Sequence, residues 1–172
     1  AQHNGIVLGQ VKTDQKSNEI TAIPKLLELL NVSGCIVTID AMGCQKKIAK
    51  AIRNKGADYF LSVKGNQEHL HQMLKTWFDH GEKVQFRGMN CTHKRTVNKG
   101  HGRIDERKIT VSSQLNDFLD WPFLKQVFKL ERRVTNIKTG QVKEREVYGF
   151  TSLTREKVTP AELLTLIRSY WG

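Results

Sequence analysis

The chain has 172 residues, of which 38% are hydrophobic and 26% are charged, a composition that excludes disorder throughout and supplies enough apolar surface for a core. Its 28 lysines and arginines outnumber its 17 aspartates and glutamates, which gives a formal net charge of +11. An excess of this size favours a polyanionic partner, most commonly nucleic acid. No apolar run approaches the roughly 20 residues of a membrane helix, so we expect no membrane partner.

The first part of the chain is predicted to alternate strands and helices. Residues 6–11 form a short apolar run that is typical of a strand. Apolar side chains then recur at helical spacing over residues 20–30, and Pro24 is expected to shorten or displace the start of that helix. The β-branched run at 35–40 predicts a buried strand that ends at Asp40.

A second helix, strand and helix follow. Residues 48–52 place apolar side chains on one helical face and basic side chains on the other. Residues 59–63 predict a second buried strand. The most regular helical pattern covers residues 70–78, and Gly81 is expected to end this helix. Together these elements predict an α/β core segment over residues 1–81.

Residues 84–150 carry no helical pattern and predict a β-rich insertion, whose expected bounds are 82–155. The predicted strands are 103–111, 128–134 and 142–150, and the predicted hairpin turn is 136–140. A capping box, Thr-Pro-Ala-Glu at 159–162, then predicts a final helix. Residues 156–172 are therefore expected to return to the core as the start of that helix.

Two predicted strand ends carry side chains suited to phosphate chemistry. Asp40 stands between a strand and a helix, where open α/β sheets bind ligands, and its carboxylate suits Mg²⁺. A turn former or a helix cap is the alternative for this residue. After the next strand, Lys64 is placed to reach a phosphate, and Asn66 or Gln67 to hydrogen-bond a backbone or a base. A strand-to-helix turn with Asn66 as N-cap is the alternative there.

Two basic runs contain no acid. Residues 41–57 carry five lysines and arginines, and residues 83–104 carry six. The second run includes the glycine-spaced segment 98–103, whose backbone is able to approach a polyanion closely. A solvated hairpin loop is the alternative for this segment. The predicted DNA contacts in this run are Lys94, Arg95, Lys99, His101 and Arg103.

The cysteines and the N-terminus bear on the cellular compartment. Three cysteines without a framework spacing suit free thiols in a reducing cytosol. Cys91, His93 and His101 lack the paired spacing of a zinc site, so no zinc is expected. No secretory signal is visible, and together with a DNA partner this predicts a cytoplasmic, nucleoid-associated protein.

Six short motifs occur in an order that resembles a known family. They are KSNEI at 16–20, TIDAMGCQ at 38–45, DY at 58–59, KGNQ at 64–67, KGHGRI at 99–104 and YWG at 170–172. The series resembles the bacterial insertion-sequence transposases of the H-repeat-associated type, within the DDE transposase class, over essentially the whole chain. The TIDAMGCQ and KGHGRI motifs are the most specific.

The resemblance implies a ribonuclease-H-like core that is interrupted by a β insertion before the final catalytic helix. It also implies three carboxylates that hold two Mg²⁺ or Mn²⁺ ions for cleavage and strand transfer of DNA. Asp40 matches the second carboxylate of the family. The first is expected on a strand before residue 1, and the third, a Glu, directly after Gly172. We therefore expect a core that is incomplete at both ends, with no metal bound and no catalysis by this chain alone.

The expected partner is DNA at transposon ends, and a homodimer is expected for the complete enzyme. A non-enzymatic nucleic-acid-binding relic of a transposase is the alternative function. A Rossmann-like phosphoryl enzyme with Asp40 as nucleophile is a weaker alternative, because no second acid stands beside Asp40.

Overall fold

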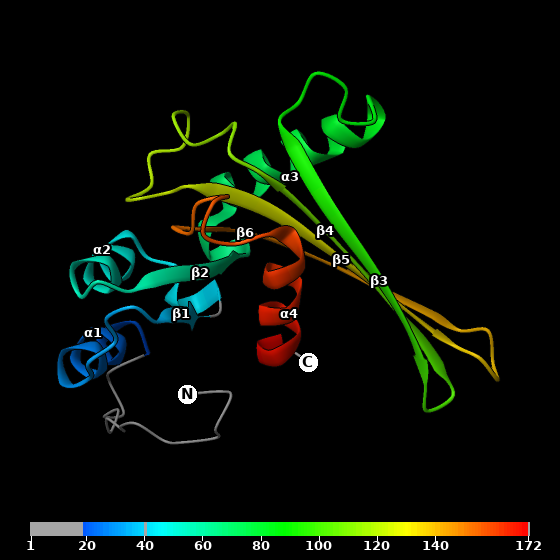
Figure 1. Ribbon diagram of the computed structural model, residues 1–172, viewed down its shortest axis with the longest axis horizontal. Helices are drawn as coiled ribbons and strands as arrows, with labels where there is room; N and C mark the ends of the chain where they lie inside the picture. Colours follow the sequence, from blue (N-terminus) through cyan, green and yellow to red (C-terminus); the bar gives the residue numbers. More distant parts are fainter. Residues whose placement is uncertain (1–18, 40, 172) are drawn as a thin grey trace.

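The structure is a computed structural model and describes residues 19–39 and 41–171 (Figure 1). In chain order its elements are α1 (Glu19–Leu29), β1 (Ile36–Ile39), η1 (Ala41–Gly43), α2 (Lys46–Asn54), β2 (Asp58–Val63), η2 (Gly65–Gln67), α3 (Glu68–Lys83), β3 (Cys91–Gly100), β4 (Arg103–Ser112), β5 (Gln126–Asn136), β6 (Val142–Thr151) and α4 (Pro160–Trp171). This mixture of helices and strands confirms the predicted α/β class. The strand predicted at 6–11 lies outside the described residues.

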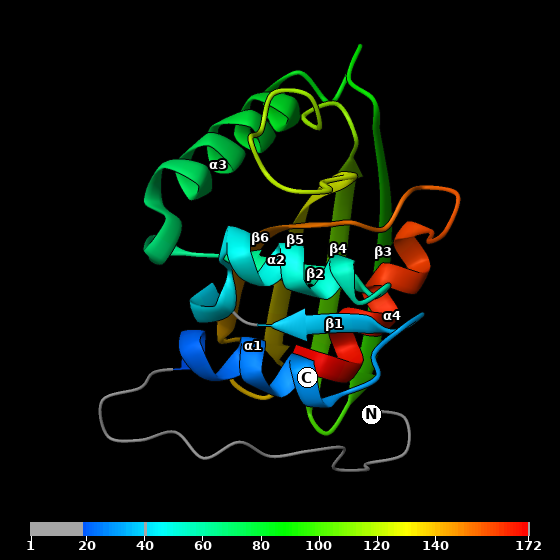
Figure 2. The same ribbon diagram turned by 90° about the vertical axis from the view of Figure 1, so that its left-hand side faces the viewer.

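A six-stranded sheet organises the described chain, in the order β1-β2-β6-β5-β4-β3. β1 and β2 run parallel, and every other neighbouring pair is antiparallel. Helices cover both faces of this sheet (Figure 2). One core cluster joins α1, α2 and α3 to Tyr59 and Leu61 of β2, whereas α4 packs on the opposite face against Phe60 and Phe128. Alternate residues of β2 thus face different helices, as the pleat of a strand requires.

The strands fall into a short pair and a long group, and we call β3–β6 the ladder. β2 ends where Val63 lies opposite Tyr148, but β6 begins six residues earlier in the chain, at Val142. The ladder therefore projects past the carboxyl ends of β1 and β2 (Figure 1). We call this projecting part, residues 94–109 and 130–147, the arm.

A turn closes each tip of the arm, at the predicted hairpin turn 136–140 and within the segment 98–103, for which a hairpin loop was the alternative. At the tip of β5 and β6, the Asn136 side chain accepts hydrogen bonds from the backbone N–H groups of Lys138 (2.9 Å) and Thr139 (3.1 Å). At the tip of β3 and β4, His101 and Gly102 both have positive φ, at 48° and 71°, which is the backbone of a type I′ hairpin turn. The segment 98–103 is thus two strand ends joined by a two-residue turn.

The capping box at the start of α4 is confirmed. Glu162 accepts a hydrogen bond from the Thr159 backbone N–H at 2.7 Å, and Thr159 Oγ1 accepts one from the Glu162 N–H at 3.3 Å. Pro160 occupies the first turn, where its missing N–H costs no hydrogen bond.

Three local predictions were wrong or incomplete. Gly81 lies inside α3 rather than ending it, and its role is close packing, because a Cβ there would stand 2.4 Å from the Phe86 ring. Pro24 lies within α1 and does not displace its start, since the apolar face of the helix packs on the core. The strand β3 was not predicted, because its largely polar sequence lies at the sheet edge, where one face needs no apolar side chains.

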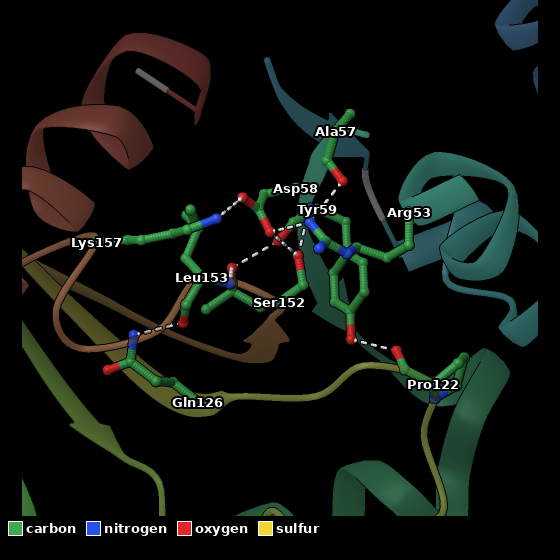
Figure 3. Close-up of polar contacts among 10 residues, drawn as sticks. Arg53, Ala57, Asp58, Tyr59, Pro122, Gln126, Ser152, Leu153 and Lys157 are labelled. Atoms are coloured by element: carbon green, nitrogen blue, oxygen red, sulfur yellow. Dashed lines mark hydrogen bonds and ion pairs between the residues drawn. The ribbon is translucent and has the colours of Figure 1, made fainter. Parts of the chain in front are cut away.

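A polar network fastens the amino end of β2 to the segment after β6 (Figure 3). Asp58 binds Arg53, accepts a hydrogen bond from Ser152 Oγ at 2.7 Å and pairs with Lys157 at 3.3 Å. Tyr59, buried beside it, donates its hydroxyl to the Pro122 carbonyl at 2.8 Å, and burial raises the pKa of this phenol. Because this network stands at the edge of the sheet opposite to the carboxyl ends of β1 and β2, we assign it to stability.

Candidate nucleic-acid interface

The carboxyl ends of β1 and β2 meet at one edge of the sheet, because these strands are parallel neighbours. β1 ends at Ile39, and η1 begins at Ala41. Asp40 lies outside the described residues, so its catalytic and metal-binding roles stay predictions. Lys64 follows β2 at the same edge and is exposed.

The loops that follow β1 and β2 are bound to each other. Gln67 Nε2 donates a hydrogen bond to the Cys44 carbonyl at 3.1 Å, which joins η2 to the turn before α2. A Cβ on Gly43 would lie 2.2 Å from Cγ2 of Ile39, so η1 packs directly on the end of β1. The edge is thus a defined surface rather than two independent loops. The side chain of Asn66 lies outside what the structure describes, and the predicted DNA contacts of Asn66 and Gln67 stay predictions.

The ladder has two faces that differ in charge, because successive residues of a strand point to opposite sides. The strand registers assign every ionisable side chain of β3–β6 to one face or the other. The face that also bears α4, which we call the cationic face, carries Lys94, Arg103, Asp105, Arg107, Arg132, Lys143 and Arg145. The opposite face, which we call the paired face, carries His93, Arg95, Lys99, Glu106, Lys108, Lys129, Glu131, Arg133, Glu144 and Glu146.

Each acid that β3–β6 carry on the paired face has a basic partner, even where like charges lie in register, as Arg95 does with Lys108 and Glu131 with Glu146. The ion pairs across neighbouring strands are Arg95–Glu106 at 2.5 Å, Lys108–Glu131 at 3.1 Å and Arg133–Glu144 at 3.4 Å. A hollow of about 460 Å³ lies among these side chains. Its lining carries four glutamates and six basic residues, among them Arg107, Arg132 and Arg145, so acids offset most of its positive charge.

Lys129 anchors α3 to the paired face. Its side chain is 1% exposed, and its ammonium group contacts Glu82 of α3 at 2.8 Å and Glu146 of β6 at 2.9 Å. Burial alone would lower the pKa of Lys129, but these two carboxylates outweigh burial and raise it. The lysine therefore stays charged and holds α3 on the ladder.

On the cationic face, three arginines stand side by side across three strands. Arg107 lies opposite Arg132, and Arg132 lies opposite Arg145. We call these three residues the arginine row. Like charges directly opposite each other on a sheet are destabilising. A bound anion would therefore reduce the electrostatic repulsion within the arginine row.

One carboxylate partly compensates the arginine row. Asp105 contacts Arg132 at 2.7 Å and Arg107 at 3.2 Å. Burial alone would raise the pKa of Asp105, but the hydrogen bonds and charges of Arg132 and Arg107 outweigh it and lower the pKa to about 2. Arg145 is exposed, and no acidic partner contacts it among the described residues.

Two hollows open on the cationic face. The first, of about 220 Å³, is lined by the arginine row together with Ser62 and Lys64 of the carboxyl edge and Ile167 of α4. The second, of about 270 Å³, lies between Arg168 of α4 and the tip of the β3–β4 hairpin, including Arg103 and, from the end of β3, Lys99. The first hollow connects the arm to the edge where Lys64 stands.

The structure divides the basic residues that the sequence analysis grouped together. Lys94 and Arg103 belong to the cationic face, Arg95 and Lys99 belong to the paired face, and His101 forms the hairpin turn. Sequence reasoning missed Arg107, Arg132, Lys143 and Arg145 as interface candidates, because acids adjoin them in the sequence. The alternation within each predicted strand was the signal that places them on one side.

No group of three or more potential metal ligands gathers in the part of the chain that the structure describes. The acids other than Asp40 that come into question as metal ligands all contact other residues. Asp105, Glu106 and Glu144 pair with arginines, Glu146 binds Lys129, and Glu162 caps α4. The described residues therefore do not by themselves fit a metal pair, and we derive no reaction step through one.

Sequence comparison places this arrangement in the class of DDE transposases. The family described as "Transposase DDE domain" matches residues 1–172, and the chain belongs to this family. Within the described helices, none has the length and apolar character needed to cross a bilayer. No solved structure matches the chain.

Curated relatives sharpen the assignment. The chain is 37% identical over 174 residues to the H repeat-associated putative transposase YhhI of Escherichia coli K12, covering 98% of this chain and 44% of the relative. It is 47% identical over 123 residues to the putative transposase YncI of E. coli O157:H7, covering 72% of this chain and 31% of the relative. The predicted resemblance to the H-repeat-associated type is confirmed. The chain spans less than half the length of these relatives.

Proposed function

We propose that this chain is part of a DNA transposase that performs metal-dependent cleavage and strand transfer of insertion-sequence DNA. Membership of the DDE family supports this reaction class. The observation that carries the proposal for this chain is the position of the arm. It projects past the carboxyl ends of β1 and β2, and Asp40 directly follows β1 in the sequence. Substrate held on the arm would thus lie close to the predicted catalytic carboxylate.

We further propose a ribonuclease-H-like core, with the division 1–81, 82–155 and 156–172. The parallel pair β1–β2 between helices supports the core, and the long antiparallel strands between β2 and α4 support the insertion. β1 is an edge strand of the described sheet, and its sequence, IVTI, has none of the charged or proline residues that protect free edges. This edge suits pairing with a further strand.

Asp40 would hold Mg²⁺ or Mn²⁺ together with carboxylates outside this chain. The bound metal would activate water or a 3′-hydroxyl and stabilise the leaving oxygen. One carboxylate holds Mg²⁺ weakly, because this ion parts reluctantly with its water. We propose that residues 1–172 alone do not cleave DNA. A homodimer of the complete enzyme stays a prediction.

Cleavage of labelled transposon-end DNA by a protein extended at both ends to the length of its relatives tests this function. Asp40→Asn in the extended protein should abolish cleavage and leave DNA affinity equal or slightly higher, since a negative group near phosphates is neutralised. Asp117→Asn, a change of the same kind at an exposed position in the insertion, should cleave normally.

Full activity of the extended Asp40→Asn protein would overturn the assignment of Asp40. Metal-dependent cleavage by residues 1–172 alone would show that another carboxylate completes the site. DNA binding without cleavage by the extended wild-type protein would favour the non-enzymatic relic.

A further inference from the structure

We propose that the DNA backbone lies across the cationic face of the ladder, with one phosphate seated in the hollow between the arginine row and Lys64. The inference rests on the proposed function in taking DNA as the substrate. It adds which side of the arm binds it and which residues do so. The paired face of the same strands takes no part.

The first argument is the charge on each face. The cationic face carries six basic residues and one acid, whereas the paired face carries five lysines and arginines and four glutamates. Glu82 of α3 adds a further acid to the paired face through Lys129. A lysine or arginine that binds a phosphate releases counterions condensed on the DNA, and a side chain already paired with a carboxylate contributes little to this exchange.

The second argument is the cost of the arginine row. Three arginines directly opposite one another repel, and one carboxylate, Asp105, contacts two of them. A phosphate oxygen near Arg145 and Lys64 would supply the missing negative charge. The hollow that these side chains line has a volume of about 220 Å³, which is room for a phosphate and its neighbouring sugar atoms.

The third argument is position. Lys64 stands at the carboxyl end of β2 and lines the same hollow as the arginine row. From that row the exposed cations Arg103 and Lys143 continue toward the hairpin tips. The arm is roughly 20 Å long at about 3.3 Å per residue, so it spans about six base pairs at 3.4 Å each. The tract leads from the arm to the edge where the sequence predicts cleavage.

Two triple variants in the extended protein test the inference with equal loss of charge. The cationic-face variant carries Arg103→Gln, Lys143→Gln and Arg145→Gln. The paired-face variant carries Arg95→Gln, Lys108→Gln and Arg133→Gln, three residues whose side chains are ion-paired on that face. Five of these side chains are exposed and Lys108 is half-buried, and all lie on the ladder or its ends, so both variants are expected to fold.

Duplex binding is measured by fluorescence anisotropy at several salt concentrations. The cationic-face variant should lose on the order of 100-fold in affinity at about 0.1 M salt, and its salt slope should fall by about three, because each phosphate contact contributes about 0.9 to the slope. The paired-face variant should bind within about threefold of the wild type.

A second pair of variants changes neighbouring residues on opposite faces. Asp105→Asn removes the acid of the cationic face and should raise DNA affinity severalfold at low salt. Glu106→Gln removes an acid from the paired face of the same strand and should change affinity less than twofold. The expected result for Asp105→Asn is a gain of DNA affinity, which a folding defect would not produce.

Equal losses in the two triple variants, or a larger loss from the paired face, would overturn the inference while leaving DNA as the substrate. Absence of DNA binding by the extended wild-type protein would instead overturn the proposed function and the inference with it.

Discussion

The two faces of the ladder are built from the same four strands, yet they differ in how their charged side chains are arranged. On the paired face, Arg133 lies opposite Glu144, and Arg95, whose register partner is Lys108, reaches Glu106 of the next strand diagonally, so both arginines have an acidic partner. On the cationic face, arginines stand across from arginines. A sheet gains from the first arrangement and loses from the second. The difference indicates that one face is organised for the fold and the other for a ligand.

The comparison also shows why a count of charges along the chain locates an interface poorly. The acid-free run 83–104 looks like one basic surface in the sequence, but β3 turns its alternate residues to opposite faces. Conversely, the segment from Glu144 to Glu146 looks acidic, although Arg145 between these acids points to the cationic face. Net charge belongs to a face rather than to a run of sequence.

The largest expected effect is on the paired face, at Lys129. Lys129→Met should lower the free energy of unfolding by about 3 kcal/mol, because it leaves Glu82 and Glu146 close together without their shared cation. Lys108→Met, which removes a half-exposed lysine from the same face, should cost less than about 1 kcal/mol. Urea unfolding of both variants measures the difference, and equal costs would contradict the anchoring role of Lys129.

Much of the fold could be predicted, because local signals determine its elements. Thr159 and Glu162 are spaced for a capping box, Asn136 and Gly140 for a hairpin turn, and the predicted strand 103–111 is observed as β4. What local pattern did not supply was tertiary context. The need for glycine at position 81 comes from the ring of Phe86, which lies outside the helical pattern. The strand β3 forms because it pairs with β4.

Of the candidate site, only the part at the carboxyl ends of β1 and β2 could be predicted from the sequence. Lys64 follows from the rule that ligands bind at the carboxyl ends of parallel strands. The arginine row does not follow from any motif, because its three members lie on three strands and meet through register. Register between strands is set by distant pairing, which a single sequence does not display. Asp40, the residue with the sharpest predicted role, stays a prediction.

An intermediate effect concerns Asp105 and acid. The pKa of Asp105 is lowered from 3.8 to about 2 in the folded chain, so folding stabilises its charged form. This contribution of roughly 2 kcal/mol is complete above pH 4 and is lost as the pH falls toward 2. Asp105→Asn should therefore be less stable than the wild type at pH 6, and the gap should narrow between pH 4 and pH 2. A gap that stays constant over this range would show that the arginines do not depress the pKa of this carboxyl.

The smallest expected effect discriminates the two faces most directly, because the change in the free energy of unfolding has opposite signs on the two faces. Arg133→Gln removes one partner of an exposed ion pair and should destabilise the chain by a few tenths of a kcal/mol. Arg145→Gln relieves repulsion in the arginine row and should stabilise it by about 0.2–1 kcal/mol. Both effects should shrink at about 1 M salt, where the screening length is roughly 3 Å. The measurement is the midpoint of urea unfolding at low salt, with guanidinium avoided because it is itself a salt. If both variants lose stability, Arg145 has a partner within the fold, and the case for a vacant anion position in the arginine row fails.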